Sequence, residues 1–123
     1  MVHSGFLNAY DSVKVKVFTL VDQITESATP SKPWRVRITG HSLGGAIATL
    51  CAYDLSARPP KTGAGSLEVS MYTFGAPRVG NKAFAKVFDE RLHNRAWRIT
   101  NASDIVPSVP RLMGYSHALP RLV

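Results

Sequence analysis

Ser42 stands in the spacing Gly40-x-Ser42-x-Gly44, with His41 and Leu43 in the intervening positions. A serine hydroxyl is a weak nucleophile, and it attacks a carbonyl carbon only when a sharp turn holds it exposed beside a base. Glycines leave room for such a turn, and we expect a Cβ at either Gly40 or Gly44 to collide with the closing strand and helix. The spacing predicts a nucleophile elbow, in which the side chain of His41 points away from the serine.

The segments on both sides of Ser42 fit a strand-to-helix turn. Residues 34–40 alternate apolar and polar side chains, which is typical of a strand. From Gly44 the chain is rich in alanine and leucine, which predicts a helix that ends before Pro59. A serine at this junction could instead serve only as the cap of the helix, and the pattern alone leaves that alternative open.

The remaining segments predict two more helices and two more strands. An amphipathic helix at the start is indicated by apolar residues at intervals of three or four: Phe6, Tyr10, Val13, Val17, Leu20 and Ile24. After a loop at 29–33 and a linker at 58–66, residues 67–74 and 96–100 are typical of strands. Between them, Asn81 can cap a helix with an apolar face formed by Phe84, Val87, Phe88 and Leu92. Strands that alternate with helices predict a parallel sheet.

Asp104 follows the last of these strands, as Ser42 follows the first. Loops that leave the carboxyl ends of parallel strands converge on one crevice, so the two side chains are expected near each other. An aspartate in this place would orient a histidine and stabilise its charged form. The alternative is an ordinary turn aspartate before Pro107.

A catalytic triad also requires a histidine, and the chain has four of them. His41 belongs to the turn, His93 ends a surface helix and His3 precedes the first helix. His117 is left as the candidate base, and the 13 residues from Asp104 to His117 can span up to roughly 40 Å, so the chain length permits contact.

Three sequence blocks, at residues 38–46, 73–81 and 101–107, resemble the class 3 (fungal-type) lipase family. They read Ile-Thr-Gly-His-Ser-Leu-Gly-Gly-Ala, Thr-Phe-Gly-Ala-Pro-Arg-Val-Gly-Asn and Asn-Ala-Ser-Asp-Ile-Val-Pro. Residues 2–6 are similar to the segment that begins the helix before the serine strand in this family. Residues 109–117 look most like the plant and algal branch of the family. The resemblance implies an α/β-hydrolase fold with a mostly parallel sheet and helices on both faces.

The same resemblance implies that the chain is the central portion of one lipase domain, over residues 1–123. In the family, the Gly-Tyr-x-His segment is present in addition to the catalytic histidine, which comes later. By this match His117 is structural and the base lies beyond Val123. The Leu43 backbone N–H supplies one oxyanion donor, and the second comes from a loop after an earlier strand. The neighbour of the strand at 34–40 would then also be missing, which leaves a sheet edge open.

Composition limits the other function classes. A chain of 123 residues is one domain at most. Its net charge of +7 comes from scattered basic residues without interleaved aromatics, which disfavours a nucleic-acid partner. The charge leaves an attraction to lipid surfaces open. We expect core packing for Cys51, no metal site, no cofactor, no membrane span and no signal peptide. The compartment is not defined; the cytoplasm and the plastid are both compatible with a plant or algal origin.

The function expected from the resemblance is hydrolysis of an acyl-lipid ester through an acyl-enzyme on Ser42. Triacylglycerol, phospholipid and galactolipid are all open as substrates. The alternatives are a thioesterase or small-ester esterase, a lipase-like module without activity that binds lipid or a partner, and an enzyme in which His117 is the base after all.

Overall fold

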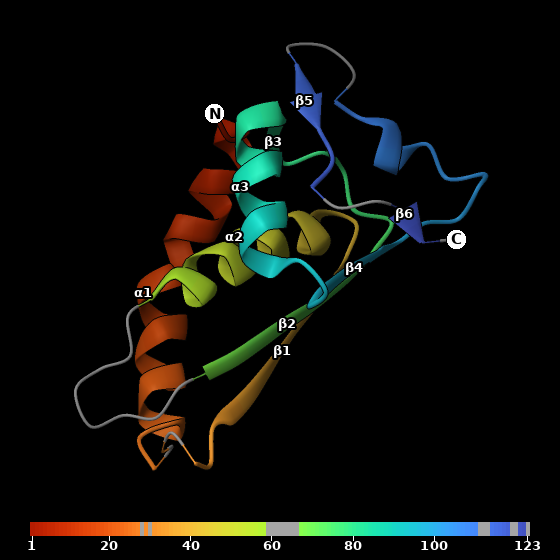
Figure 1. Cartoon of the computed structure of the whole chain (residues 1–123). Helices are drawn as coiled ribbons and strands as arrows, with labels where there is room; N and C mark the ends of the chain where they lie inside the picture. The colour runs from red at the N-terminus through yellow and green to blue at the C-terminus, as the bar shows by residue number, and fades with distance from the viewer. Residues whose placement is uncertain (28, 30, 59–66, 111–113, 119–120, 123) are drawn as a thin grey trace.

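The computed structural model describes residues 1–27, 29, 31–58, 67–110, 114–118 and 121–122 (Figure 1). The main elements are α1 (Ser4–Ile24), β1 (Trp34–His41), α2 (Leu43–Ala57), β2 (Leu67–Phe74), α3 (Lys82–Leu92) and β4 (Ala96–Ile99). The shorter ones are β3 (Gly80–Asn81), a 3-10 turn η1 (Val106–Ser108), β5 (Tyr115–Ser116) and β6 (Arg121–Leu122). The linker predicted at 58–66 lies outside the described residues apart from Arg58.

The main sheet has the strand order β1-β2-β4-β6, and all of its neighbouring strands run parallel. In this register His41, Phe74 and Ile99 lie side by side, so β1, β2 and β4 end at the same edge of the sheet. The prediction of a parallel sheet is confirmed, and it places Ser42 and the residues after Ile99 at one edge.

The helices α1, α2 and α3 lie on one face of this sheet, where α2 contacts β1 and β2 and is flanked by α1 and α3 (Figure 1). Along β2, Val69, Met71 and Thr73 are buried, whereas Glu68, Tyr72 and Phe74 are exposed on the opposite face. The expectation of helices on both faces is therefore wrong for the described residues, because only alternate residues of β2 are covered. The α/β class with a parallel sheet holds.

The first helix packs with a different face from the one predicted. Phe6 and Tyr10 do contact the core, but Val13, Leu20 and Ile24 are exposed. Their places are taken by Phe18 and Val21, which pack against the core from the adjacent side of the helix. Many apolar residues in α1 allow two helical registers, and the tertiary packing selects one.

The other predicted elements agree closely with the structure. The Asn81 side chain accepts a hydrogen bond from the Phe84 N–H at 3.0 Å, which is the expected cap of α3. Phe84, Phe88 and Leu92 are buried, whereas Val87 is exposed.

Cys51 is partly buried and packs against the core, as expected. Burial raises the pKa of its thiol, and the charge of Asp54 adds to the effect. The thiol thus stays protonated and behaves as a small apolar side chain.

The pairing of β3 with β5 was not predicted. It is antiparallel and joins two-residue strands that are 34 residues apart along the chain at Asn81 and Tyr115. No helix among the described residues is both long enough and apolar enough to cross a bilayer.

Candidate active site

Ser42 occupies the turn between β1 and α2 with φ 53° and ψ −121°. A positive φ is costly for a residue with a Cβ, so the surrounding structure must hold it there. The Ser42 N–H donates to the Phe74 carbonyl at 2.9 Å, which fixes the turn to the end of β2, and its own carbonyl accepts from Gly45 N–H. The sequence-based prediction of a sharp, strained turn is confirmed.

The Ser42 side chain makes no capping hydrogen bond to α2. Its hydroxyl forms no hydrogen bond with any described residue, and the residue is only half-buried. The alternative in which this serine merely caps the helix is therefore wrong. A half-exposed hydroxyl on a strained turn is the arrangement that a serine nucleophile requires.

Two glycines allow close approaches of the backbone around the turn, and only one of them, Gly40, is among the two predicted. A Cβ at Gly40 would lie 2.2 Å from the Gly44 carbonyl oxygen, so no side chain fits there. At Gly44 itself a Cβ would meet nothing within 4 Å, and the prediction for that position is wrong. The second close approach is at Gly45, where a Cβ would lie 2.6 Å from the Cβ of Ala76.

The start of α2 places the backbone N–H of Leu43 directly after Ser42. Leu43 is the first residue of the helix, and the residue is 51 % exposed. The first N–H groups of a helix have no intrahelical acceptor, and the helix dipole adds partial positive charge there. The Leu43 N–H therefore has no acceptor within α2.

Asp104 is held at the same edge of the sheet as Ser42. Its Oδ1 accepts a hydrogen bond from the Val106 N–H at 2.9 Å, and its own N–H donates to the Asn101 carbonyl at 3.1 Å. These two bonds fix the carboxylate. The other oxygen, Oδ2, faces Gly75, where a Cβ would lie 2.8 Å from it.

Gly75 is the residue that brings the two sides of the site together. It directly follows Phe74, whose carbonyl binds the Ser42 N–H, and its own N–H donates to the Ile99 carbonyl at 2.8 Å. Its φ of +61° also favours glycine. Sequence reasoning did not single out Gly75, although a glycine directly after a strand, at the edge where parallel strands end, is a usable signal.

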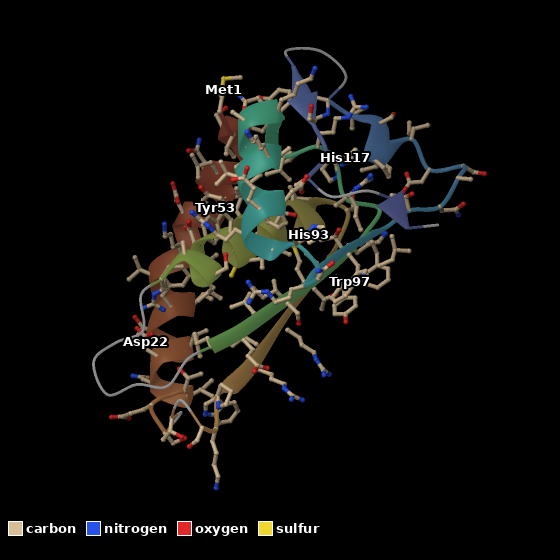
Figure 2. The ribbon with its side chains drawn as sticks, in the orientation of Figure 1. Met1, Asp22, Tyr53, His93, Trp97 and His117 are labelled. Atoms are coloured by element: carbon tan, nitrogen blue, oxygen red, sulfur yellow. The ribbon has the colours of Figure 1, made fainter. Side chains whose placement is uncertain are left out.

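His117 directly follows β5 (Figure 2) and is half-buried. Its Nε2 is hydrogen-bonded to the Pro107 carbonyl, and it makes no hydrogen bond to Ser42 or Asp104. Burial and the charge of Arg98 lower the pKa of His117 from 6.5 to about 4, although the bond to Pro107 opposes the shift. The ring is neutral at pH 7.

Of the other three histidines, His41 lies next to Gly75, the residue that Asp104 Oδ2 faces. His3 caps α1, where its Nδ1 accepts from the Gly5 N–H at 3.2 Å. His93 is exposed at the end of α3 (Figure 2). His41 is exposed at the end of β1, and its Nε2 lies 3.8 Å from the Cβ position at Gly75.

Among the described residues no three His, Cys, Asp or Glu side chains are grouped so that they could hold a metal ion. The groups gathered at the sheet edge are a hydroxyl, a carboxylate and helix N–H donors. This set suits nucleophilic attack on a carbonyl.

A parallel sheet whose first described strand ends in a strained serine turn, followed at once by a helix, defines an α/β-hydrolase. The sequence model of one family, "Lipase (class 3)", matches residues 1–113. The chain belongs to the class 3 lipase family, as its three sequence blocks predicted.

Curated relatives agree with this membership. A lipase from Rhizomucor miehei is 44 % identical over 120 residues, which cover 95 % of this chain and 31 % of that protein. The chloroplastic phospholipase A(1) DAD1 from Arabidopsis thaliana is 40 % identical over 119 residues, which cover 89 % of this chain and 24 % of that protein. The chain thus spans about a third or less of these relatives.

Solved structures of lipases share the fold. The triacylglyceride lipase from Rhizomucor miehei superposes with a TM-score of 0.76 at 40 % identity, covering 98 % of this chain and 43 % of that one. The Lip2 lipase from Yarrowia lipolytica gives a TM-score of 0.77 at 30 % identity, covering 98 % of this chain and 41 % of that one.

Proposed function

We propose that this chain carries the nucleophile and acid of a serine acyl hydrolase that cleaves carboxylic ester bonds of acyl lipids. The observation that carries the proposal is the strained, uncapped Ser42 at the end of β1, with no hydrogen bond from its hydroxyl to any described residue. The relatives named lipase and phospholipase A(1) support lipid esters as substrates, with triacylglycerol, phospholipid and galactolipid as the candidate classes.

In the proposed reaction Ser42 Oγ attacks the ester carbonyl while a histidine removes its proton. The Leu43 N–H and a second donor stabilise the oxyanion. When the oxyanion collapses, the ester bond breaks and the alcohol leaves with the proton from the histidine. Water then attacks the acyl-enzyme while the same histidine takes the proton of the water. The bond between the acyl group and Ser42 Oγ breaks, the histidine returns the proton to Oγ, and the fatty acid is released.

Asp104 is the proposed partner of that histidine. Val106 N–H occupies its Oδ1, so Oδ2 is the oxygen that faces the edge of the sheet where Ser42 lies. We assign the base to a histidine outside this chain, because the ring of His117 is hydrogen-bonded to the Pro107 carbonyl rather than to Asp104. On this proposal residues 1–123 are the central portion of one lipase domain.

Covalent labelling by a fluorophosphonate tests the assignment of Ser42. We expect any adduct on the chain to map to Ser42 by mass spectrometry, to disappear in Ser42→Ala and to persist in His117→Ala. Loss of the adduct in His117→Ala without unfolding would instead identify His117 as the base. An adduct on another serine would contradict the proposal.

The second candidate function is a lipase-like module that binds lipid or a partner without turnover. It is favoured by the observation that His117 has no hydrogen bond to the carboxylate of Asp104, which leaves the described residues without a paired base. A chain that binds lipid vesicles but never forms an adduct at Ser42, even when a base is added, would favour it.

A further inference from the structure

The direction of the Asp104 carboxylate depends on the short turn η1 that follows it. The first residue of η1 is Val106, whose N–H donates to Asp104 Oδ1 at 2.9 Å. The turn itself is closed by the Ser108 N–H, which donates to the Ile105 carbonyl at 2.9 Å, and by the Val109 N–H, which donates to the Val106 carbonyl at 3.1 Å. A 3-10 turn of three residues is a weak element on its own, so the carboxylate stays in place only if other segments hold η1.

His117 holds η1 by its central residue. The ring Nε2 is hydrogen-bonded to the carbonyl of Pro107, which is buried. A carbonyl oxygen only accepts, so Nε2 carries the hydrogen and donates it. Burial lowers the pKa of the ring to about 4, so at pH 7 the ring is neutral and this is its one N–H. The single donor of His117 is therefore spent on the turn that carries the donor to Asp104.

The backbone on both sides of this contact is anchored to one segment of the chain. β5 directly precedes His117 and pairs with β3. Arg78, two residues before β3, binds the residues that follow η1: its N–H donates to the Val109 carbonyl at 2.8 Å and its Nη1 to the Pro110 carbonyl at 3.2 Å. Because β3 fixes β5, the ring of His117 has a firm base from which to hold Pro107.

We propose that His117 is a positioning residue for the reaction at Ser42, and that it holds the carboxylate of Asp104 through the Pro107 carbonyl and η1. The inference rests on the proposed function and gives His117 a role other than that of the base. Its ring makes no hydrogen bond to Ser42 or Asp104, so it acts through the turn alone. Without this donor η1 opens more readily, the Val106 N–H leaves Oδ1, and the carboxylate turns away from the histidine that it orients.

Hydrogen exchange of the Val106 amide tests the hold of His117 on Asp104 without any turnover. We expect exchange about tenfold faster in His117→Leu, because the turn opens when the Pro107 carbonyl loses its donor. His117→Gln has an amide N–H near the position of Nε2, so its exchange should stay within about threefold of the unaltered chain. His93→Leu is the matched control, since His93 is exposed at the end of α3. Unchanged exchange of the amides in α2 shows that the fold is intact.

Acylation of Ser42 by 4-nitrophenyl butyrate with added imidazole tests the consequence for the reaction. We expect the rate constant for imidazole-dependent acylation to fall by about threefold or more in His117→Leu and to recover in His117→Gln. In an Asp104→Asn background His117→Leu should have no further effect, because both residues act through the same carboxylate. A merely structural role would lower the rate by the same factor in both backgrounds.

Each outcome decides the proposal. Equal exchange of the Val106 amide in His117→Leu and in the unaltered chain overturns it, as does an equal loss of rate in the Asp104→Asn background. If His117→Leu does not fold, His117→Asn takes its place, because its amide corresponds to Nδ1 rather than Nε2.

Two further results separate this proposal from the proposed function. Acylation without imidazole that both His117→Leu and His117→Gln abolish would make His117 the base and overturn the positioning role. Faster exchange of the Val106 amide as expected, with no acylation of Ser42 in the unaltered chain even when imidazole is present, would sink the proposed function and leave the hold of His117 on Asp104 standing.

Discussion

The backbone at Ser42 adopts a conformation that glycine would adopt at lower cost, since its φ is 53°. We predict that Ser42→Gly is more stable to urea than Ser42→Ala by about 1 kcal/mol, because only the alanine keeps a Cβ in the strained turn. Unfolding followed by tryptophan fluorescence measures the difference. Equal stability of the two variants would mean that the turn stores no strain.

The glycines of the elbow give a second prediction with its own control. Gly40→Ala should destabilise the chain by at least about 3 kcal/mol, because the new Cβ would meet the backbone of Gly44 and nothing flexible can move away. Gly44→Ala has open space and should cost little. Similar unfolding midpoints for the two variants would contradict this account of the turn.

The glycine pattern shows what could be predicted at this scale and what could not. The spacing around Ser42 correctly placed a strained turn and the close approach at Gly40. It could not distinguish Gly44 from Gly45, because the side chain that Gly45 would meet belongs to Ala76, about thirty positions further on. Gly75 could not be predicted for the same reason, since the atoms nearest its Cβ position belong to His41 and Asp104.

His117 predicts how stability depends on pH. Its folded pKa of about 4 lies below the ordinary 6.5, so the unfolded chain binds more protons between these values. The contribution of the neutral His117 ring to the free energy of unfolding is complete above pH 6.5. It is lost as the pH falls toward 4, by at most about 3 kcal/mol.

Unfolding free energies at pH 7 and pH 4.5 measure this loss. In His117→Gln the dependence on pH should be shallower than in the unaltered chain, whereas His93→Gln, at an exposed position, should follow the unaltered chain. If the unfolding free energy of His117→Gln changed with pH in parallel with that of the unaltered chain, the lowered pKa of His117 would be refuted.

At the scale of elements, α1 packs on α2 through an apolar interface, and polar contacts to Asp54 add to it. The Tyr10 hydroxyl donates to Asp54 Oδ2 at 3.0 Å, and Lys14 Nζ lies 2.7 Å from the same oxygen. Burial raises the pKa of Tyr10, and the hydrogen bond to Asp54 adds to the effect, so the phenol stays protonated and donates.

Removing this hydroxyl should loosen α1. Tyr10→Phe is expected to lower the unfolding free energy by about 1 kcal/mol, because the buried ring keeps its packing but the hydrogen bond is lost. Lys86→Gln is the control, since its ion pair with Glu90 is exposed at 3.9 Å and should contribute less than about 0.5 kcal/mol. Thermal denaturation followed by circular dichroism compares them, and an unchanged Tyr10→Phe would show that the contact carries no stability.

The elements themselves were predicted best where one pattern dominates. The alternation in Leu67–Phe74 gave β2 with its correct bounds, and Asn81 marked the start of α3. The face of α1 was predicted wrongly, since Val13 and Phe18 fit two helical registers equally well. The pairing of β3 with β5 could not be predicted, because two-residue strands are too short to show a pattern and their partners lie far apart in the chain.

At the scale of the whole molecule, the described chain presents one helix-covered face and one open face of a parallel sheet (Figure 1). The three sequence blocks, spread over the chain, meet at one edge of this sheet because β1, β2 and β4 end together. The sequence thus predicted the meeting of Ser42 and Asp104 at one edge. A cleft beside Asp104, lined by Arg78, Arg98 and Thr100 among others, was not predicted, since no short motif joins these residues.

The most direct test of the account is rescue by an added base. Acylation of the chain by 4-nitrophenyl butyrate is measured with and without imidazole, and the rate of Ser42→Ala at the same imidazole concentration is the background. We predict that imidazole yields a butyryl adduct on Ser42, found by mass spectrometry, at a rate at least tenfold above that background. Equal rates for the two chains, with no adduct on Ser42, would contradict the claim that this hydroxyl is held ready for attack.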